Sequence, residues 1–222
     1  MANNSIFDIL TPIMVGPSSS HTAGAVRIGL LARKIFGTDL PKSVKFILYN
    51  SFAKTGKGHG TDKGLMSGVL GYDVDDVRIK ASLDIAKEFG VDYIFEYKED
   101  FNRHPNSVDI IFDGKYPIKV SGQSVGGGEV EITNINGYKV SLKGDYPTLL
   151  LIYKDKPGMI YRVTTLIQNY NINIASMTCD RSAKGKDASM SISLDSALVP
   201  EILTALENIN EIYMIRSIEV TK

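Results

Sequence analysis

Two short stretches in the first half of the chain combine side chains that can transfer protons or bind a small polar ligand. The first, residues 16–24, holds three consecutive serines followed by His21 and Thr22, and it directly precedes a predicted helix. The first turn of a helix offers free N–H groups and a partial positive charge, which bind carboxylates and phosphates. We expect His21 to transfer a proton or orient an ammonium group there. The expected substrate-binding hydroxyls are those of Ser18, Ser19, Ser20 and Thr22.

A serine-rich loop that only caps the following helix is the alternative, because capping needs just one of these groups. Glycines on both sides of the stretch allow a ligand to approach the backbone closely, which favours binding. The residues alone leave both interpretations open.

The second stretch, Gly56–Asp62, places Lys57 and His59 between glycines, in a predicted flexible loop over residues 55–64. A cation and a titratable imidazole suit acid–base catalysis or anion binding, so His59 is a second candidate catalytic residue. Thr61, where a helix is predicted to begin, is a further candidate for substrate binding. A mobile, solvated surface loop is the competing interpretation.

Two other features are weaker. His104 precedes a proline in a sequence typical of a turn, where an exposed histidine is the ordinary case. The run Ser124–Glu129 is rich in glycine, but it lacks the Gly-Lys-Ser/Thr ending of a phosphate-binding loop and leads into a strand. We expect that run to let the backbone approach a ligand or a partner.

The elements that would position these residues fall into two halves. In the first half, a helix is expected over residues 25–36, strands over 44–49, 93–97, 108–112, 118–120 and 129–133, and short helices after Thr61 and over 82–89. A further apolar run covers residues 6–10. Asn136-Gly137 predicts a type I′ hairpin leading into a strand over 138–142. This half is therefore an N-terminal α/β domain with a mostly antiparallel sheet.

The second half alternates in the order βαββαβ. Strands are expected over residues 148–153, 172–177, 188–194 and 212–220, and a turn at Lys156-Pro157-Gly158 starts the first helix. Ile160, Val163, Ile167 and Tyr170 are expected on its apolar face. This order predicts a ferredoxin-like fold. The fold class is thus α+β, with domains at residues 1–145 and 146–222.

Charge and cysteine content restrict the function further. Lys+Arg and Asp+Glu both number 25, so no basic surplus attracts nucleic acid. The N-terminus lacks a signal-peptide pattern and no apolar run reaches the roughly 20 residues of a membrane span, so a cytoplasmic protein is expected. The single cysteine, Cys179, excludes an internal disulfide. Any iron–sulfur cluster would need another chain, and Cys179 itself is expected to be a buried apolar side chain.

These motifs together resemble the iron–sulfur L-serine dehydratases. The resemblance rests on residues 6–10 with 16–22, on Gly58–Asp62, on His104–Asn106 and on Ser124–Gly128, which follow one another in the order of that family. Residues 148–222 resemble an ACT domain, including the turn at Pro157. The matching features span almost the whole chain.

The resemblance implies an activity and a partner. Members with two chains divide the enzyme between an α subunit, whose cysteines hold a [4Fe–4S] cluster, and a β subunit, which matches this chain with its one cysteine. The implied reaction converts L-serine to pyruvate and ammonia. The hydroxyls of residues 18–22 would fix the substrate carboxylate and ammonium, with His59 nearby as a polar contact or proton shuttle.

The ACT resemblance implies regulation and self-association. Such domains pair side by side and bind an amino acid where the first loop meets the neighbouring subunit. L-Serine is the expected effector, and a purely dimerising role is the alternative. The candidate regulatory residues are Pro157, Gly158, Met159, Asn171 and Ile172.

The sequence is compatible with two other functions. The first half also resembles the substrate-binding regulatory domain of some phosphoglycerate dehydrogenases, which would make this chain a non-catalytic sensor of serine-like acids. A pure sensor would not need both histidine-containing stretches. Pyridoxal phosphate could support the same elimination, but the roughly 145 residues before the ACT domain are few for that fold, and no lysine accompanies a phosphate-binding loop.

Overall fold

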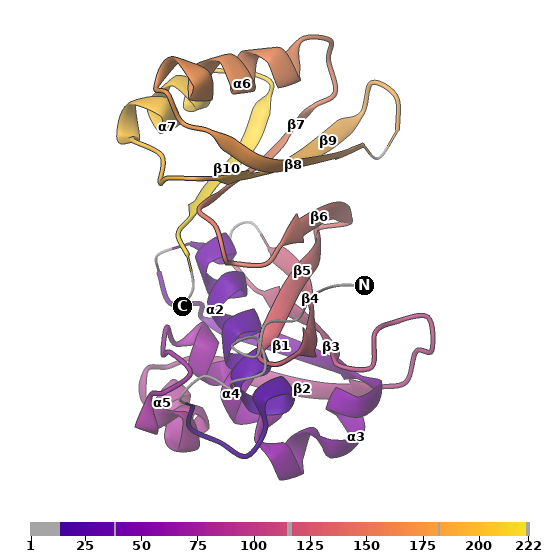
Figure 1. Ribbon diagram of the computed structural model, residues 1–222. Coiled ribbons are helices and arrows are strands. Elements are labelled where there is room, and N and C mark those ends of the chain that lie inside the picture. The colour runs from indigo at the N-terminus through magenta and orange to yellow at the C-terminus, as the bar shows by residue number, and fades with distance from the viewer. Residues whose placement is uncertain (1–13, 38, 115–116, 182, 221–222) are drawn as a thin grey trace, which may run out of the picture. The chain divides into compact units, whose positions relative to one another are not determined.

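The computed structural model describes residues 14–37, 39–114, 117–181 and 183–220, and the chain divides into two compact units between Asn136 and Gly137 (Figure 1). The expected apolar run over residues 6–10 lies outside the described residues. Among the described residues, no helix is both long and apolar enough to cross a membrane.

The first unit contains helices and a mostly antiparallel sheet, as predicted. Its helices are α2 (Gly24–Phe36), α3 (Asn50–His59), α4 (Thr61–Val69) and α5 (Ser82–Glu88), with a π-helical turn over Ser19–Ala23 and a 3-10 turn over Val77–Ala81. Its strands are β1 (Ser43–Tyr49), β2 (Asp92–Lys98), β3 (Ser107–Phe112), β4 (Ile118–Gly126) and β5 (Glu129–Ile135). The strand order is β2-β1-β3-β4-β5-β6, where β6 (Tyr138–Leu142) belongs to the second unit. The β1–β2 pair is parallel, and the pairs β1–β3, β3–β4 and β4–β5 are antiparallel.

The sheet of the first unit is covered by helices whose apolar residues meet its strands. Ile28 and Leu31 of α2 are completely buried, and Phe36 stacks on Phe112 of β3 with ring centroids 4.7 Å apart. Helices α2 and α4 also pack backbone against backbone. A Cβ atom on Gly68 would lie 2.1 Å from the carbonyl oxygen of Val26, so only glycine permits this approach.

The hairpin signal at Asn136-Gly137 is confirmed by the backbone. Asn136 has φ 51° and Gly137 has φ 93°, and two consecutive positive φ values are what a type I′ turn requires. The turn connects β5 to β6.

The second unit has the predicted βαββαβ order. It comprises β7 (Thr148–Lys154), α6 (Met159–Asn169), β8 (Ile174–Arg181), β9 (Asp187–Leu194), α7 (Pro200–Glu207) and β10 (Ile212–Ile218), and its antiparallel sheet has the order β10-β7-β9-β8. The two helices cover one face of this sheet (Figure 1). On β9, Ser189 and Ser191 donate to the carbonyls of Lys139 and Ser141 in β6.

Three expectations about local structure were wrong. Residues 55–59 are not a loop but the last turns of α3, where Phe52 is fully buried and Gly56 packs closely against Thr61 and Leu48. On α6, Ile160 is 47% exposed and Tyr170 is 46% exposed, and Met159 joins the core instead. Adjacent helix residues point about 100° apart, so with Met159 in the core Ile160 faces away from it. Tyr170 follows Asn169, the last residue of α6.

The third error concerns Cys179, which is exposed rather than buried. Strand β8 continues to Arg181, beyond the expected end at residue 177, and it forms an edge of the second sheet. Every side chain from Ala175 to Cys179 is exposed, so the part of the strand that carries Cys179 lies outside the core of the second unit.

Candidate active site

The imidazole of His21 is held by two hydroxyl groups of helix α3. Its Nε2 lies 3.2 Å from Ser51 Oγ and 3.1 Å from Thr55 Oγ1. Thr55 Oγ1 donates its own hydrogen to the carbonyl of Ser51, so it can only accept from His21. Nε2 therefore carries the ring hydrogen, and Nδ1 is the basic nitrogen of the neutral ring.

The ring of His59 lies beside that of His21. The ring centroids are 5.1 Å apart, and Phe52 packs edge-on against His21 at 5.3 Å. His59 Nδ1 donates to the carbonyl of Thr55 over 3.0 Å, because a carbonyl oxygen can only accept. The two stretches singled out in the sequence thus meet in space, and each contributes one imidazole.

The surroundings of His21 favour its neutral form. Burial lowers the pKa of His21, and the neighbouring His59 lowers it further, while the contact with Ser51 acts in the opposite direction. A neutral imidazole at neutral pH can accept a proton, which a general base must do.

The serine-rich stretch is helical rather than a loop. Ser18 caps the π-helical turn, because its Oγ accepts from the backbone N–H of His21 at 3.1 Å, and the turn runs directly into α2. Ser18, Ser19 and Ser20 are half-buried, so part of each side chain reaches solvent. The predicted helix start next to the candidate substrate hydroxyls is therefore present, but it begins at Ser19 rather than after Gly24.

The two threonine candidates face the interior of the first unit. Thr22 is 2% exposed, and its Oγ1 donates to the carbonyl of His59 over 2.7 Å, which ties the serine-rich turn to the end of α3. Thr61 is fully buried and packs against Gly56 at the start of α4, as the predicted helix start required.

A cleft next to the two hydroxyls that hold His21 was not foreseen from the sequence. It has a volume of about 330 Å³ and is lined by Ser51 and Thr55 of α3 and by the loop over residues 100–105, including Arg103. Ser51 and Thr55 escaped notice because α3 was expected to be a loop. Recognised as a helix, the i, i+4 spacing of the two hydroxyls would have placed them on one face.

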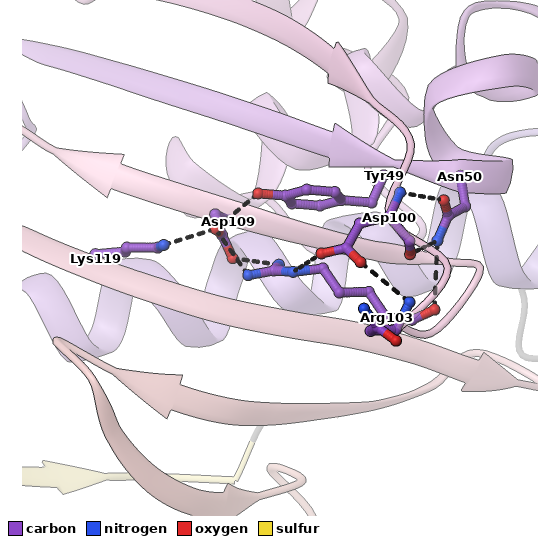
Figure 2. Close-up of polar contacts among 7 residues, drawn as sticks. Tyr49, Asn50, Asp100, Arg103, Asp109 and Lys119 are labelled. Carbon is purple, nitrogen blue, oxygen red and sulfur yellow. Dashed lines mark hydrogen bonds and ion pairs between the residues drawn. The ribbon is translucent and has the colours of Figure 1, made fainter.

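The loop over residues 100–105 is fastened to the start of α3. The carbonyl of Pro105 accepts from the backbone N–H groups of Ser51 (2.9 Å) and Phe52 (3.4 Å), which caps the helix. The amide of Asn50 donates to the carbonyl of Asp100 and accepts from its N–H, as Figure 2 shows. His104 accepts from the N–H of Asn106 through Nδ1, which stabilises the turn. This stretch therefore contributes to the shape of the cleft.

The glycine run after Ser124 is part of a β-hairpin. Strand β4 continues to Gly126, and Gly127 and Gly128 have positive φ values in the turn to β5. The carbonyl of Gly128 accepts from Arg27 of α2. Its observed contact is thus with this chain itself.

The expected regulatory residues fall into two groups at opposite ends of α6. Pro157, Gly158 and Met159 line a hollow of about 500 Å³ together with Lys156. Asn171 and Ile172 follow the C-terminal end of the helix, where Asn171 has φ 56°. Glu211 accepts from Lys156 and Arg162, and these hydrogen bonds lower the pKa of Glu211 to about 2.

No metal site was found among residues 14–37, 39–114, 117–181 and 183–220, where no three His, Cys, Asp or Glu side chains are grouped as ligands. A cubane cluster needs about three or four thiolates, and the chain has only Cys179, on β8 of the second unit. The residues of this chain therefore do not fit such a cluster by themselves.

The fold and the paired histidines define a class: an α+β domain with two adjacent imidazoles, followed by an ACT-type domain. Comparison with protein families agrees. Residues 5–92 match the family described as serine dehydratase beta chain, and residues 148–211 match the ACT domain.

Curated relatives match over the full length. The chain is 41% identical to the "Probable L-serine dehydratase, beta chain" of Bacillus subtilis, with 100% of this chain and 99% of the relative covered. It is 39% identical to the "L-serine dehydratase, beta chain" of Peptoniphilus asaccharolyticus, with 99% and 100% covered. The chain belongs to the family of L-serine dehydratase beta chains.

A more distant similarity links the chain to another enzyme. A D-3-phosphoglycerate dehydrogenase of Synechocystis is 28% identical over 66% of this chain, which corresponds to 26% of that protein. The similarity expected between the two kinds of protein is therefore present.

Proposed function

We propose that this chain is the β subunit of an L-serine ammonia-lyase that converts L-serine to pyruvate and ammonia. The observation that carries the proposal is the pair of adjacent imidazoles, His21 and His59, of which His59 lines a hollow together with Thr22, in a chain with full-length similarity to dehydratase beta chains. Elimination of water from serine requires removal of a weakly acidic α-proton, and a neutral imidazole is suited to accept it.

The roles of the side chains follow from their positions. His21 transfers the proton through its basic Nδ1, and His59 relays it or makes a polar contact with the substrate. The half-buried hydroxyls of Ser18, Ser19 and Ser20 bind polar groups of the substrate. Thr22 and Thr61 belong to the same site but are buried. Thr22 supports the site by donating to the carbonyl of His59.

We assign the [4Fe–4S] cluster to a partner, the cysteine-bearing α subunit, because one cysteine cannot hold it. Such a cluster supplies a Lewis acid for the departing hydroxyl. The complete active site would then lie where the two subunits meet, and the enzyme would function in the cytoplasm.

The two parts of the chain divide the work. Residues 1–145 bind the substrate, and residues 146–222 form the regulatory ACT domain. The hollow at Pro157, Gly158 and Met159 supports an effector site, for which L-serine is the proposed ligand. Asn171 and Ile172 would contact the effector from a second copy of the chain in a side-by-side pair.

Reconstitution tests the proposed function. Mixing this chain with the cysteine-bearing α subunit under anaerobic conditions should produce pyruvate from L-serine, and exposure to air should abolish the activity as the cluster degrades. The chain alone should be colourless and inactive. Dehydratase activity from the purified chain alone, free of iron and insensitive to oxygen, would contradict the assignment.

The similarity to phosphoglycerate dehydrogenase supports one alternative, a non-catalytic sensor of serine-like acids. Under that alternative, L-serine binds to the chain but the mixture with the α subunit forms no pyruvate.

A further inference from the structure

A buried carboxylate in the first unit, that of Asp109, contacts two cationic side chains. Asp109 on β3 is completely buried, and it accepts from Arg103 through two parallel contacts of 2.8 and 3.2 Å. Lys119 lies 2.8 Å from the same carboxylate, and the Tyr49 hydroxyl donates to it over 3.1 Å (Figure 2). Burying a charge is costly unless it is paired, so this arrangement keeps Asp109 ionised.

The ionised state of Asp109 agrees with its pKa. Burial would raise the pKa of Asp109, but the hydrogen bonds from Arg103 and Lys119 outweigh it, and the pKa lies below the usual value. Arg103 and Lys119 share the negative charge of Asp109, and Arg103 also lies 3.6 Å from the Asp100 carboxylate.

The guanidinium of Arg103 is fixed in orientation. Besides the two contacts to Asp109, it lies over the Tyr49 ring, 4.0 Å from the centroid. A guanidinium has five N–H groups, and the fork to Asp109 uses two of them. Among the described residues, Nε has a contact of 3.6 Å to Asp100, which is longer than a hydrogen bond. Arg103 therefore keeps donor capacity.

The Arg103 side chain lies at the cleft that Ser51 and Thr55 also line, so its remaining N–H donors are available there. Arg103 forms part of the cleft wall, and its side chain is 30% exposed. Ser51 and Thr55 line the same cleft, and their hydroxyls contact His21 Nε2. A planar guanidinium matches a carboxylate, and charge-assisted contacts of this kind are the stronger hydrogen bonds.

We propose that Arg103 binds the carboxylate of the amino acid in this cleft, and that the buried Asp109 fixes the guanidinium for this contact. The proposal rests on the proposed function and names the group that recognises the acid end of its substrate. Arg103 is then a substrate-binding residue, and Asp109 is a positioning residue that acts through it.

The chain offers a matched control for this constellation. Arg78 donates to Asp76 through Nε and Nη2 and lies 3.8 Å from the centroid of the Tyr72 ring, so it repeats the Arg–Asp–Tyr arrangement. Arg78 is not among the residues that line the cleft. Arg78→Gln removes a similar set of contacts without touching the proposed site.

The experiment compares L-serine with L-serinamide, which lacks the carboxylate, in the enzyme reconstituted with the α subunit. The KM for L-serine and the inhibition constant of L-serinamide are measured for each variant. Arg103→Gln should raise the KM for L-serine by about 10- to 100-fold, the range expected for a lost charge-assisted contact. The inhibition constant of L-serinamide should change by less than about threefold, because this compound has no carboxylate to contact Arg103.

Arg103→Lys should give an intermediate KM, because it keeps the charge and loses the fork. Asp109→Asn should raise the KM for L-serine more than the inhibition constant of L-serinamide. Arg78→Gln should alter neither constant. If both Arg103 variants raise the KM for L-serine and the inhibition constant of L-serinamide by the same factor, Arg103 has a structural role and the proposal is overturned. An unchanged KM for L-serine also overturns it. If Arg103→Gln does not fold, the ratio in Arg103→Lys decides.

The outcome separates this inference from the proposed function. Pyruvate formation by the unaltered assembly, with unchanged discrimination in the Arg103 variants, overturns the carboxylate assignment alone. Absence of pyruvate from the unaltered assembly overturns both.

Discussion

In the part of the chain that the structure describes, His21 contacts hydroxyl groups and a second imidazole, and none of these contacts is with a carboxylate. A carboxylate would raise the pKa of the histidine and favour the charged ring, whereas burial and His59 lower it. Ser51 and Thr55 fix the orientation of the ring without that charge. The residue is therefore prepared to accept a proton at neutral pH.

The titration of His21 should reflect this environment. In the unaltered chain its pKa lies below 6.5, and His59→Gln should raise it, because the second-largest cause of the lowering is removed. The chain has only three histidines, so the ring signals can be assigned and followed by NMR from pH 5 to 8. An unchanged titration of His21 in His59→Gln would show that the two rings do not interact.

The same shift links His21 to stability. The folded pKa is lower than that of the unfolded chain, so the unfolded state binds the proton first as the pH falls. The contribution of His21 to stability is thus present above pH 6.5 and decreases as the pH falls below it. Denaturation in urea at pH 7.5 and 5.5 should show a smaller loss for His21→Gln than for the unaltered chain.

Catalysis gives a further test of this residue. In the reconstituted enzyme, His21→Ala should lower kcat by about 100-fold or more, the usual contribution of a general acid or base. Ser19→Ala should mainly raise KM, because its hydroxyl is expected to bind and not to react. Near-normal kinetics in both variants would remove the serine-rich turn from the active site.

At the scale of elements, two close contacts hold the site together. The carbonyl of Pro105 caps α3, which carries the two hydroxyls that touch His21. Helices α2 and α4 meet through Gly29 and Gly68, where added Cβ atoms would lie 2.4 Å from Leu65 O and 2.1 Å from Val26 O. The turn that carries His21 runs into α2, so this packing also positions the proposed catalytic residue.

Gly68→Ala should therefore destabilise the first unit. Overpacking a close contact costs about 1–3 kcal/mol, and here the obstructing atoms belong to the backbone and cannot rotate away. Gly58→Ala is the matched control, because no atom lies within 4 Å of its added Cβ and the position is helical. It should be neutral or stabilising by about 0.5–1 kcal/mol. Urea unfolding measures both, and equal effects would contradict the packing argument.

At the scale of the whole molecule, the chain joins a histidine-containing unit to an ACT domain with its own hollow. Lys156 lines that hollow and pairs with Glu211, which fixes the turn before α6. The exposed edge strand β8 belongs to the same domain. Regulation and self-association are therefore properties proposed for the second unit, and catalysis for the first.

Calorimetry on the full chain should separate the two binding sites. L-Serine should release or absorb heat in the unaltered chain, and Gly158→Val should remove the part due to the ACT domain, because Gly158 has φ 86° and lines the hollow. His21→Ala should leave that part unchanged. A trace that is flat for all amino acids tested would leave dimerisation as the role of the ACT domain.

The sequence by itself determined much of this protein. Apolar periodicity specified α2 and the strands of both units, because burial of one face requires it. Asn136-Gly137 specified its turn, since both residues accept positive φ. The order of elements in the second unit was sufficient for the ferredoxin-like fold. The serine–histidine and glycine–histidine stretches were recognisable as candidates from residue types alone.

Only the tertiary structure decided what these candidates touch. Gly56 and Gly58 favour a loop by local propensity, but burial of Phe52 and the cap from Pro105 stabilise a helix there. Local sequence also cannot report that β3 carries a buried Asp109 beside Arg103, or that Ser51 lies 3.2 Å from His21. Such contacts join residues far apart in the chain, and they depend on the strand order and on the packing of α3, which no local pattern encodes.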